Sequence, residues 1–201
     1  MYEVEVKVRA AHDAVEPALA AAGATAAGAV LQEDVYYDAP HRDFAETDEA
    51  LRIRRERSLD GAGQSPAGDT DGGAPDDWET TRITYKGPLL EAESKSREEH
   101  ETAVDDGEAA AGIFDGLGFE PAATVRKARQ YYHLDEYTVT LDSVEGLGEF
   151  VEVETETEDE AIESAREGAL DRLESLDLDP DDQIRTSYLG LLLADSGNEC
   201  L

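Results

Sequence analysis

The sequence predicts an α+β fold in which an eight-stranded antiparallel β-barrel, or tunnel, is flanked by helices. Two observations support this prediction. Eight stretches alternate apolar and polar residues as strands do, and helical patterns lie between and after them. Charged residues of both signs recur on one face of these strands, which is unfavourable in an interior unless something charged binds there.

The first strand shows the alternation clearly. Glu3, Glu5 and Lys7 share one face, and valines lie between them. The same period of two predicts strands over residues 2–10, 31–38, 50–57, 81–87, 94–103, 123–134, 137–144 and 149–156. Mainly antiparallel strands in this number close naturally into a barrel, with one face inward and helices over part of the other.

Four helices are predicted by apolar residues that recur at helical spacing. They span residues 12–22, 106–117, 158–176 and 182–194. The second begins at acidic capping residues and ends before Gly118, and the third has an acidic first turn.

The chain length of 201 residues predicts a single domain, 1–201, that is large enough to close a core. Residues 58–80 are rich in Gly, Asp and Pro and predict a long, flexible insertion loop between two strands. Cys200 is the single cysteine, so neither a disulfide framework nor a cysteine metal site is expected.

The composition is strongly acidic, with 49 Asp and Glu against 17 Lys and Arg and a formal net charge of -32. A surface so acidic and poor in lysine is typical of haloarchaeal proteins adapted to high salt. It argues against a surface for nucleic acid or for an anionic membrane. The chain enters a strand at once, without a signal peptide, and its Ala-rich stretch is too weakly apolar for a membrane span, so we expect a cytoplasmic protein.

The charged strand faces contain the candidate site. For any one strand, a solvated face explains the charges better than a function does. The distribution changes this balance, because three of the four lysines of a lysine-poor chain fall on such faces. The predicted lumen has an acidic cluster of Glu3, Glu5, Asp142, Glu152 and Glu154. Its basic cluster consists of Lys7, Arg52, Arg54, Lys86, Lys127 and Arg129.

These two clusters suit one kind of ligand. Clustered carboxylates are hard oxygen ligands for Mg²⁺ or Mn²⁺. Lysines and arginines opposite them suit phosphate oxygens. A triphosphate chelated to a divalent metal ion satisfies both clusters at once.

Several motifs occur in order along the chain. They are Glu3-x-Glu5-x-Lys7, Asp34-Val-Tyr-Tyr37-Asp38, Ala50-Leu-Arg52-Ile-Arg54, Thr84-Tyr-Lys86-Gly-Pro88, Lys95-Ser-Arg97-Glu-Glu99-His-Glu101, Val125-Arg-Lys127-Ala-Arg129, Leu141-Asp142, Gly148-Glu-Phe-Val-Glu152-Val-Glu154 and Ser187-Tyr188. In this order they resemble the CYTH superfamily, which groups class IV adenylyl cyclases, thiamine triphosphatases and tunnel-type inorganic triphosphatases. The resemblance covers nearly the whole chain outside residues 58–80.

The resemblance implies roles for the lumen residues. The metal ligands would be Glu3, Glu5, Asp142, Glu152 and Glu154, and the catalytic residues Glu3, Glu5, Lys7 and Glu154. The phosphates would be held by Lys7, Arg52, Arg54, Lys86, Lys127 and Arg129, with Arg97 as a further ligand. Glu99 and Glu101 are expected to orient neighbouring bases. Arg185 stands where the family often has a lysine and is expected to replace it as a further substrate ligand, although as a permanent cation it is a poorer proton donor or acceptor.

The function we expect is therefore a reaction on a triphosphate with Mg²⁺ or Mn²⁺ as cofactor. The motifs resemble the class IV adenylyl cyclase branch most, which favours conversion of ATP to cyclic AMP and pyrophosphate. The alternative is a triphosphatase acting on tripolyphosphate, thiamine triphosphate or a nucleotide. A non-catalytic sensor ranks lower, because it would not need the complete carboxylate set. The expected assembly is a monomer or a homodimer.

Overall fold

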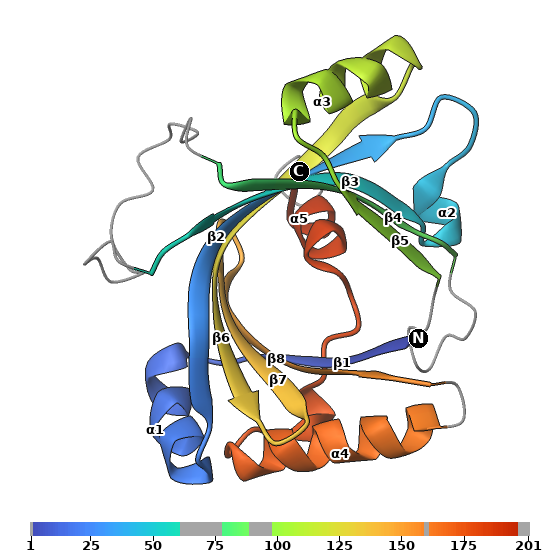
Figure 1. The fold of residues 1–201 in the computed structure, drawn as a ribbon. Helices are drawn as coiled ribbons and strands as arrows, with labels where there is room; N and C mark the ends of the chain where they lie inside the picture. The colour runs from blue at the N-terminus through green and yellow to red at the C-terminus, as the bar shows by residue number, and fades with distance from the viewer. Residues whose placement is uncertain (1, 61–77, 89–97, 159–160, 197–201) are drawn as a thin grey trace.

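Eight antiparallel strands form one curled sheet in the computed structural model, which describes residues 2–60, 78–88, 98–158 and 161–196 (Figure 1). The strands are β1 (Tyr2–Arg9), β2 (Thr25–Asp38), β3 (Ala50–Ser58), β4 (Thr80–Lys86), β5 (Glu99–Ala103), β6 (Glu120–Leu134), β7 (Tyr137–Val144) and β8 (Gly148–Thr157). Their order across the sheet is β1-β8-β7-β6-β2-β3-β4-β5.

The predicted fold of eight antiparallel strands with flanking helices is confirmed. The sheet curls into a half-barrel whose two edges are β1 and β5. The backbone N–H of Ile184 donates a hydrogen bond of 2.7 Å to the carbonyl oxygen of Lys7 on β1. A segment near the C-terminus thus lies along the edge of β1, where a closed barrel would need another strand.

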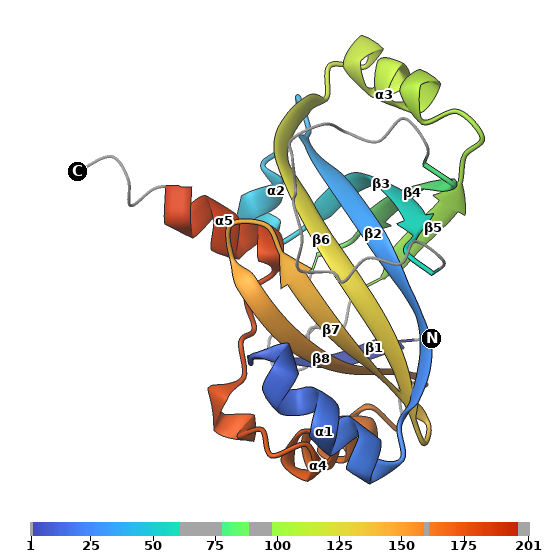
Figure 2. The ribbon, with the colours of Figure 1, turned by 90° about the vertical axis from the view of Figure 1, so that its left-hand side faces the viewer.

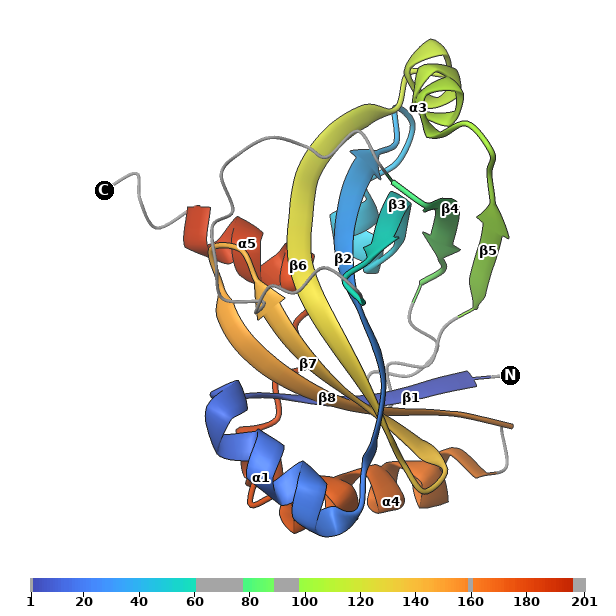
Figure 3. The same ribbon diagram turned by 60° about the vertical axis from the view of Figure 1, so that its left-hand side comes forward.

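Strands β2 and β6 are the longest, with 14 and 15 residues, and join the two halves of the sheet (Figure 3). We predicted a start for β2 near residue 31, but it begins at Thr25. Its first part is weakly apolar and contains Gly28, so the alternation is hard to recognise there. Pairing with β6, in which Thr25 lies opposite His133, overrides the weak local propensity.

The helices are α1 (His12–Ala22), α2 (Phe44–Thr47), α3 (Gly107–Gly116), α4 (Ile162–Ser175) and α5 (Tyr188–Ser196), with a 3₁₀ helix η2 (Pro180–Asp182). The short α2 was not predicted, because four residues show no helical period. The last helix begins at Tyr188 and not at Asp182, because the preceding residues form η2 and then a non-helical segment. In the described part of the chain, no helix is both long and apolar enough to cross a membrane.

The main core lies on the convex face of the sheet. Figures 1 and 2 show α1 and α4 beneath the half that contains β1, β8 and β7. The strand residues of this core are Val6, Val8, Val139, Leu141, Val151 and Val153, and the helix residues include Val15, Leu19, Ala169, Leu173 and Leu176. Complete burial of each valine or leucine side chain in this core contributes about 1.5–3 kcal/mol to folding. Because neighbouring residues of a strand point to opposite faces, this packing turns the charged residues to the concave face.

The concave face receives α5, which lies inside the curl (Figure 1). Tyr188 at the start of α5 packs with Val125, Val144 and Phe150, whose strands also carry groove charges. In the other half of the sheet, Ala110 and Phe114 of α3 pack against Tyr37, Leu51 and Ile53. The concave face of the sheet beside α5, with the side chains that it carries, is called the groove below.

The predicted insertion joins two neighbouring antiparallel strands, since Glu56 of β3 pairs with Thr80 of β4. Its residues 61–77 lie outside the described part of the chain. The insertion as a separate flexible element of a single domain remains a prediction.

Candidate active site

Three carboxylates meet at the β1 edge of the groove. Glu3 and Glu5 project from β1 and Glu154 from β8, where Glu5 lies directly opposite Glu154. One oxygen from each lies within 4.8 Å of the others. This acidic triad, Glu3, Glu5 and Glu154, is an all-oxygen donor set of the kind that Mg²⁺ and Mn²⁺ prefer.

The triad is electrostatically strained without a cation. Burial raises the pKa of Glu154 to about 7, and the negative charges of Glu3, Glu152 and Glu5 add to this effect while Arg129 opposes it. Burial also raises the pKa of Glu3. The positive charge of Lys86 opposes this effect, and the negative charge of Glu5 adds to it. A proton or a metal ion relieves this repulsion, so the donor set fits a divalent cation.

Asp142 and Glu152 are more deeply buried than the carboxylates of the triad, and they lie among the groove bases. Asp142 is fully buried and accepts hydrogen bonds from Nε of Arg129 at 2.6 Å and Nζ of Lys127 at 3.1 Å. Although burial alone would raise it, Arg129 and Lys127 hold the pKa of Asp142 well below its usual range. Glu152 is paired with Arg129 and lies 3.7 Å from Nζ of Lys7. Their oxygens are thus held by cations.

Lys7 and Arg129 connect this buried network to the triad. Nζ of Lys7 lies 3.7 Å from Glu5 as well as 3.7 Å from Glu152. Nη1 of Arg129 lies 4.0 Å from Glu154. Each base thus spans a triad carboxylate and a deeper one, so a ligand that binds the triad also meets two positive charges.

A second pair of bases is held by Asp34, whose part the sequence analysis did not recognise. Arg54 donates to Asp34 through Nε at 2.6 Å and Nη2 at 2.7 Å, a two-pronged ion pair, and Arg52 donates at 3.2 Å. Although burial opposes it, Arg52 and Arg54 hold the pKa of Asp34 well below its usual range. Asp34 was visible as the acid on the inward face of a predicted strand, but its partners depend on register.

Arg52 still has a donor to offer. Its Nε is buried and has no hydrogen-bond partner among the residues that the structure describes. A buried guanidinium N–H without an acceptor is unfavourable, and an anion in the groove would satisfy it.

The far wall of the groove comes from β4 and β5. Nζ of Lys86 lies 2.9 Å from Glu99, and Lys86 also lowers the pKa of Glu3 on β1. Glu101 accepts from the hydroxyl of Thr84 at 3.0 Å and lies 3.5 Å from Nε of Arg82. Glu99 and Glu101 thus contact groove bases, and their role in orienting these bases stays a prediction. Arg82 is a further groove base that was not predicted.

Of two further predicted phosphate ligands, the structure places Arg185 outside the groove. Arg97 lies outside the described residues. Arg185 lines a separate pocket with Arg166 and Gln183. Tyr188, whose hydroxyl donates to Asp142 at 2.9 Å, is a further residue of the groove that was not predicted as part of the site.

The geometry agrees with comparisons to known proteins. The CYTH domain family model matches residues 1–188. The chain belongs to the CYTH family. A Methanocaldococcus jannaschii protein named "Putative adenylate cyclase" is 36% identical over 193 residues, which cover 95% of this CYTH chain and 98% of that protein.

Solved structures show the same CYTH fold. A Pyrococcus horikoshii protein superposes with a TM-score of 0.80 at 36% identity, covering 96% of this chain and 99% of that one. A Hippeastrum protein has a TM-score of 0.63 at 19% identity, covering 97% of this chain and 96% of that one. It is described as a "putative adenylyl cyclase" with a dominant triphosphatase activity. The CYTH family comprises adenylyl cyclase-like proteins and triphosphatases that bind triphosphates.

Proposed function

We propose that this protein is a divalent-metal-dependent enzyme that acts on a triphosphate bound in the groove. The observation that carries the proposal is the acidic triad beside a curved row of buried bases. In a metal-chelated triphosphate, the metal ion can bind to the carboxylates of the triad, and the phosphate oxygens can accept hydrogen bonds from the bases. A sensor would bind phosphate without three mutually repelling carboxylates, so an enzyme is favoured.

The groove bases are held ready for phosphate before it arrives. Asp34 orients Arg52 and Arg54, and Asp142 orients Lys127 and Arg129. Each arginine retains N–H donors beyond those that its carboxylate accepts. Bases fixed in this way lose little freedom on binding and stabilise the charge that moves onto phosphate oxygens during reaction.

Glu3, Glu5 and Glu154 would hold the cation, with Asp142 and Glu152 contributing through the bases that they position. Mg²⁺ or Mn²⁺ bound there would neutralise phosphate charge and lower the pKa of an attacking hydroxyl or water. Lys7 lies between Glu5 and Glu152, and its ammonium group can stabilise negative charge that develops on the adjacent phosphate.

Adenylyl cyclase activity is the first form of this proposal. The 3′-hydroxyl of ATP attacks the α-phosphorus, the bond to the β-phosphate oxygen breaks, and pyrophosphate leaves with the charge that the bases stabilise. The name of the M. jannaschii relative, which matches almost the whole chain, supports this form.

Triphosphatase activity is the second form. Water attacks the terminal phosphorus and loses a proton to solvent, the bond from this phosphorus to the bridging oxygen breaks, and orthophosphate forms while the same bases stabilise the departing diphosphate. The description of the Hippeastrum protein, which shares the fold, keeps this form open.

Product analysis tests the proposal. The protein is incubated with ATP, tripolyphosphate or thiamine triphosphate and Mg²⁺ or Mn²⁺ in high salt, and ³¹P NMR with nucleotide chromatography identifies the products. We expect cyclic AMP and pyrophosphate from ATP. Orthophosphate release without cyclic AMP would establish the triphosphatase. Saturable binding without turnover of any substrate would contradict an enzyme. Glu145→Gln, in an exposed turn outside the groove, is the control for lost negative charge.

A further inference from the structure

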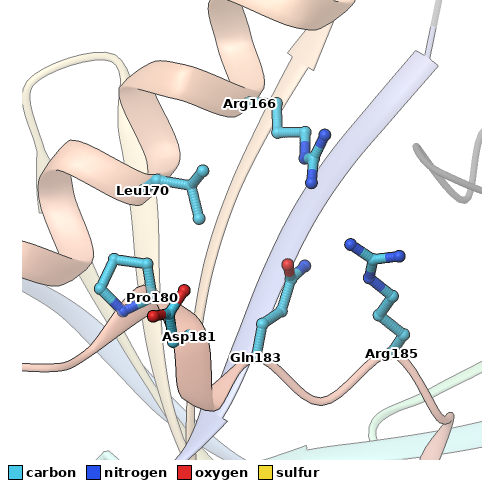
Figure 4. Close-up of a pocket in the computed structure, with 6 residues that line it drawn as sticks. All are labelled: Arg166, Leu170, Pro180, Asp181, Gln183 and Arg185. Atoms are coloured by element: carbon cyan, nitrogen blue, oxygen red, sulfur yellow. The ribbon is translucent and has the colours of Figure 1, made fainter.

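A pocket of about 360 Å³ lies between α4 and the segment that leads to α5 (Figure 4). Its lining residues are Arg166, Leu170, Pro180, Asp181, Gln183 and Arg185. The guanidinium groups of Arg166 and Arg185 and the amide of Gln183 point toward one shared space, while Leu170, Pro180 and Asp181 form the opposite wall (Figure 4). We call this the arginine pocket.

The arginine pocket is separate from the groove. Leu170 packs against the core on the convex face of the sheet. Gln183 and Arg185 line the pocket, whereas Ile184 between them packs with Tyr188 and Phe150 on the concave side. The backbone bond from Ile184 to Lys7 places this crossing at the edge of β1. Arg185 therefore turns away from the triphosphate site.

The two arginines lack the partners that the groove arginines have. Among the residues that the structure describes, neither Arg166 nor Arg185 has a carboxylate oxygen within 4.0 Å. Among the described arginines, Arg9 and Arg57 also have no carboxylate oxygen within 4.0 Å, but neither of them lines the pocket. Two like charges that face the same space repel each other. An anion bound between them would be attracted to both and would offset this repulsion.

We propose that the arginine pocket binds a small phosphomonoester. A phosphate monoester has a charge near −2 and three acceptor oxygens, which match two guanidinium groups, whereas one guanidinium suffices for a carboxylate. Leu170 and Pro180 offer an apolar wall to the carbon part of the ligand. Asp181 disfavours a second anionic group at that end. The volume exceeds that of a bare phosphate and lies within the range of small-molecule sites.

Calorimetric titration tests the proposal, with glycerol 3-phosphate as the probe and a chelator present to exclude metal-dependent binding. The wild type, Arg166→Gln, Arg185→Gln and Arg172→Gln are compared. Arg172 is the matched control, because it lies on the same helix but is paired with Asp135 at 3.0 Å and does not line the pocket. Arg54→Ala controls for binding in the groove. Circular dichroism checks that every variant is folded.

We expect one saturable site that either pocket variant weakens roughly tenfold or more, since each removes charged hydrogen bonds. Arg172→Gln and Arg54→Ala should bind as the wild type does, and glycerol should not bind. The proposal is overturned if the wild type shows no saturable binding or if both pocket variants retain full affinity. Loss of binding in Arg54→Ala alone would assign the probe to the groove. Equal affinity for glycerate would contradict the phosphate class. None of these outcomes depends on the reaction in the groove.

Discussion

Tyr188 on α5 donates its hydroxyl to Oδ2 of Asp142 on β7 at 2.9 Å, and two lysines lie over its ring. The ammonium of Lys7 is 4.3 Å and that of Lys127 is 4.9 Å from the ring centroid. An aromatic face attracts cations, so one side chain of the last helix holds two groove lysines and a buried acid. Helix α5 therefore supports groove bases that we propose bind phosphate.

Substitutions at Tyr188 separate these two contributions. Tyr188→Phe keeps the ring and removes the hydrogen bond to a charged group, which should lower the free energy of unfolding by about 1.5–3 kcal/mol. Tyr188→Leu also removes the cation–π contacts and should weaken tripolyphosphate binding further than Tyr188→Phe does. Chemical denaturation and calorimetry in high salt measure both quantities. Equal tripolyphosphate affinity in the two variants would show that the ring does not position the lysines.

The acidic triad is tested by neutral isosteres. Glu5→Gln and Glu154→Gln should each abolish turnover, because each removes a cation ligand, while relief of repulsion keeps the fold stable. Turnover and thermal melting of the two variants are compared with those of Glu145→Gln. Full wild-type turnover in excess EDTA would rule out the metal site.

The raised pKa of Glu154 makes the stability of the metal-free protein depend on pH. The folded state binds this proton more tightly than the unfolded state, because the pKa rises from 4.5 to about 7. The free energy of unfolding should therefore fall as pH rises from 4.5 to about 7, by roughly 3 kcal/mol from this group. Glu154→Gln should flatten that part of the profile and be more stable than the wild type at pH 8. Denaturation with a chelator at several pH values measures this, and identical slopes would refute it.

Metal and triphosphate should stabilise the fold together. Tripolyphosphate alone is repelled by the negative charges of the triad, and metal alone provides no phosphate oxygens for the remaining donors of the bases. Both together should add about 2.7 kcal/mol at a hundredfold excess over the dissociation constant. Thermal melts at constant salt with metal, with tripolyphosphate and with both reveal the synergy. It should weaken in Arg54→Ala and Lys86→Ala, and merely additive shifts would argue against one shared site.

The insertion should be dispensable for the fold. Replacing residues 60–76 by a short Gly-Ser linker should leave the melting midpoint nearly unchanged, because this segment has no periodic apolar pattern. Differential scanning calorimetry of the shortened protein measures the midpoint. A large decrease would mean that the insertion packs as part of the domain.

The strands and their charged faces could be predicted from the sequence because a period of two is a local signal. The contacts between these charges could not be predicted, because they depend on the register of the strands and on the curl of the sheet. Glu5 lies opposite Glu154, but Asp142 lies opposite Arg129, so acids of one predicted cluster divide between the triad and the bases.

The position of Arg185 shows the same limit at a helix boundary. A predicted helix starting at Asp182 did not fix the direction of the Arg185 side chain. In the structure, η2 and the crossing at Ile184 place this side chain beside α4. Asp34 and Tyr188 gain their roles from residues distant in the chain, which no local pattern reveals.

The pairing of β1 with β8 has a consequence for how the protein is made. Glu5 meets Glu154, so the acidic triad joins the beginning of the chain to a strand that is synthesised much later. During translation, β1 emerges long before β8, which is its one strand neighbour in the described part of the chain, and the β1 valines of the core lack this neighbour until then. Closing such a long loop is slow, because its entropy is lost before the contacts form. The groove should therefore appear late in folding, and a ribosome-bound chain that ends before β8 should be unable to bind metal.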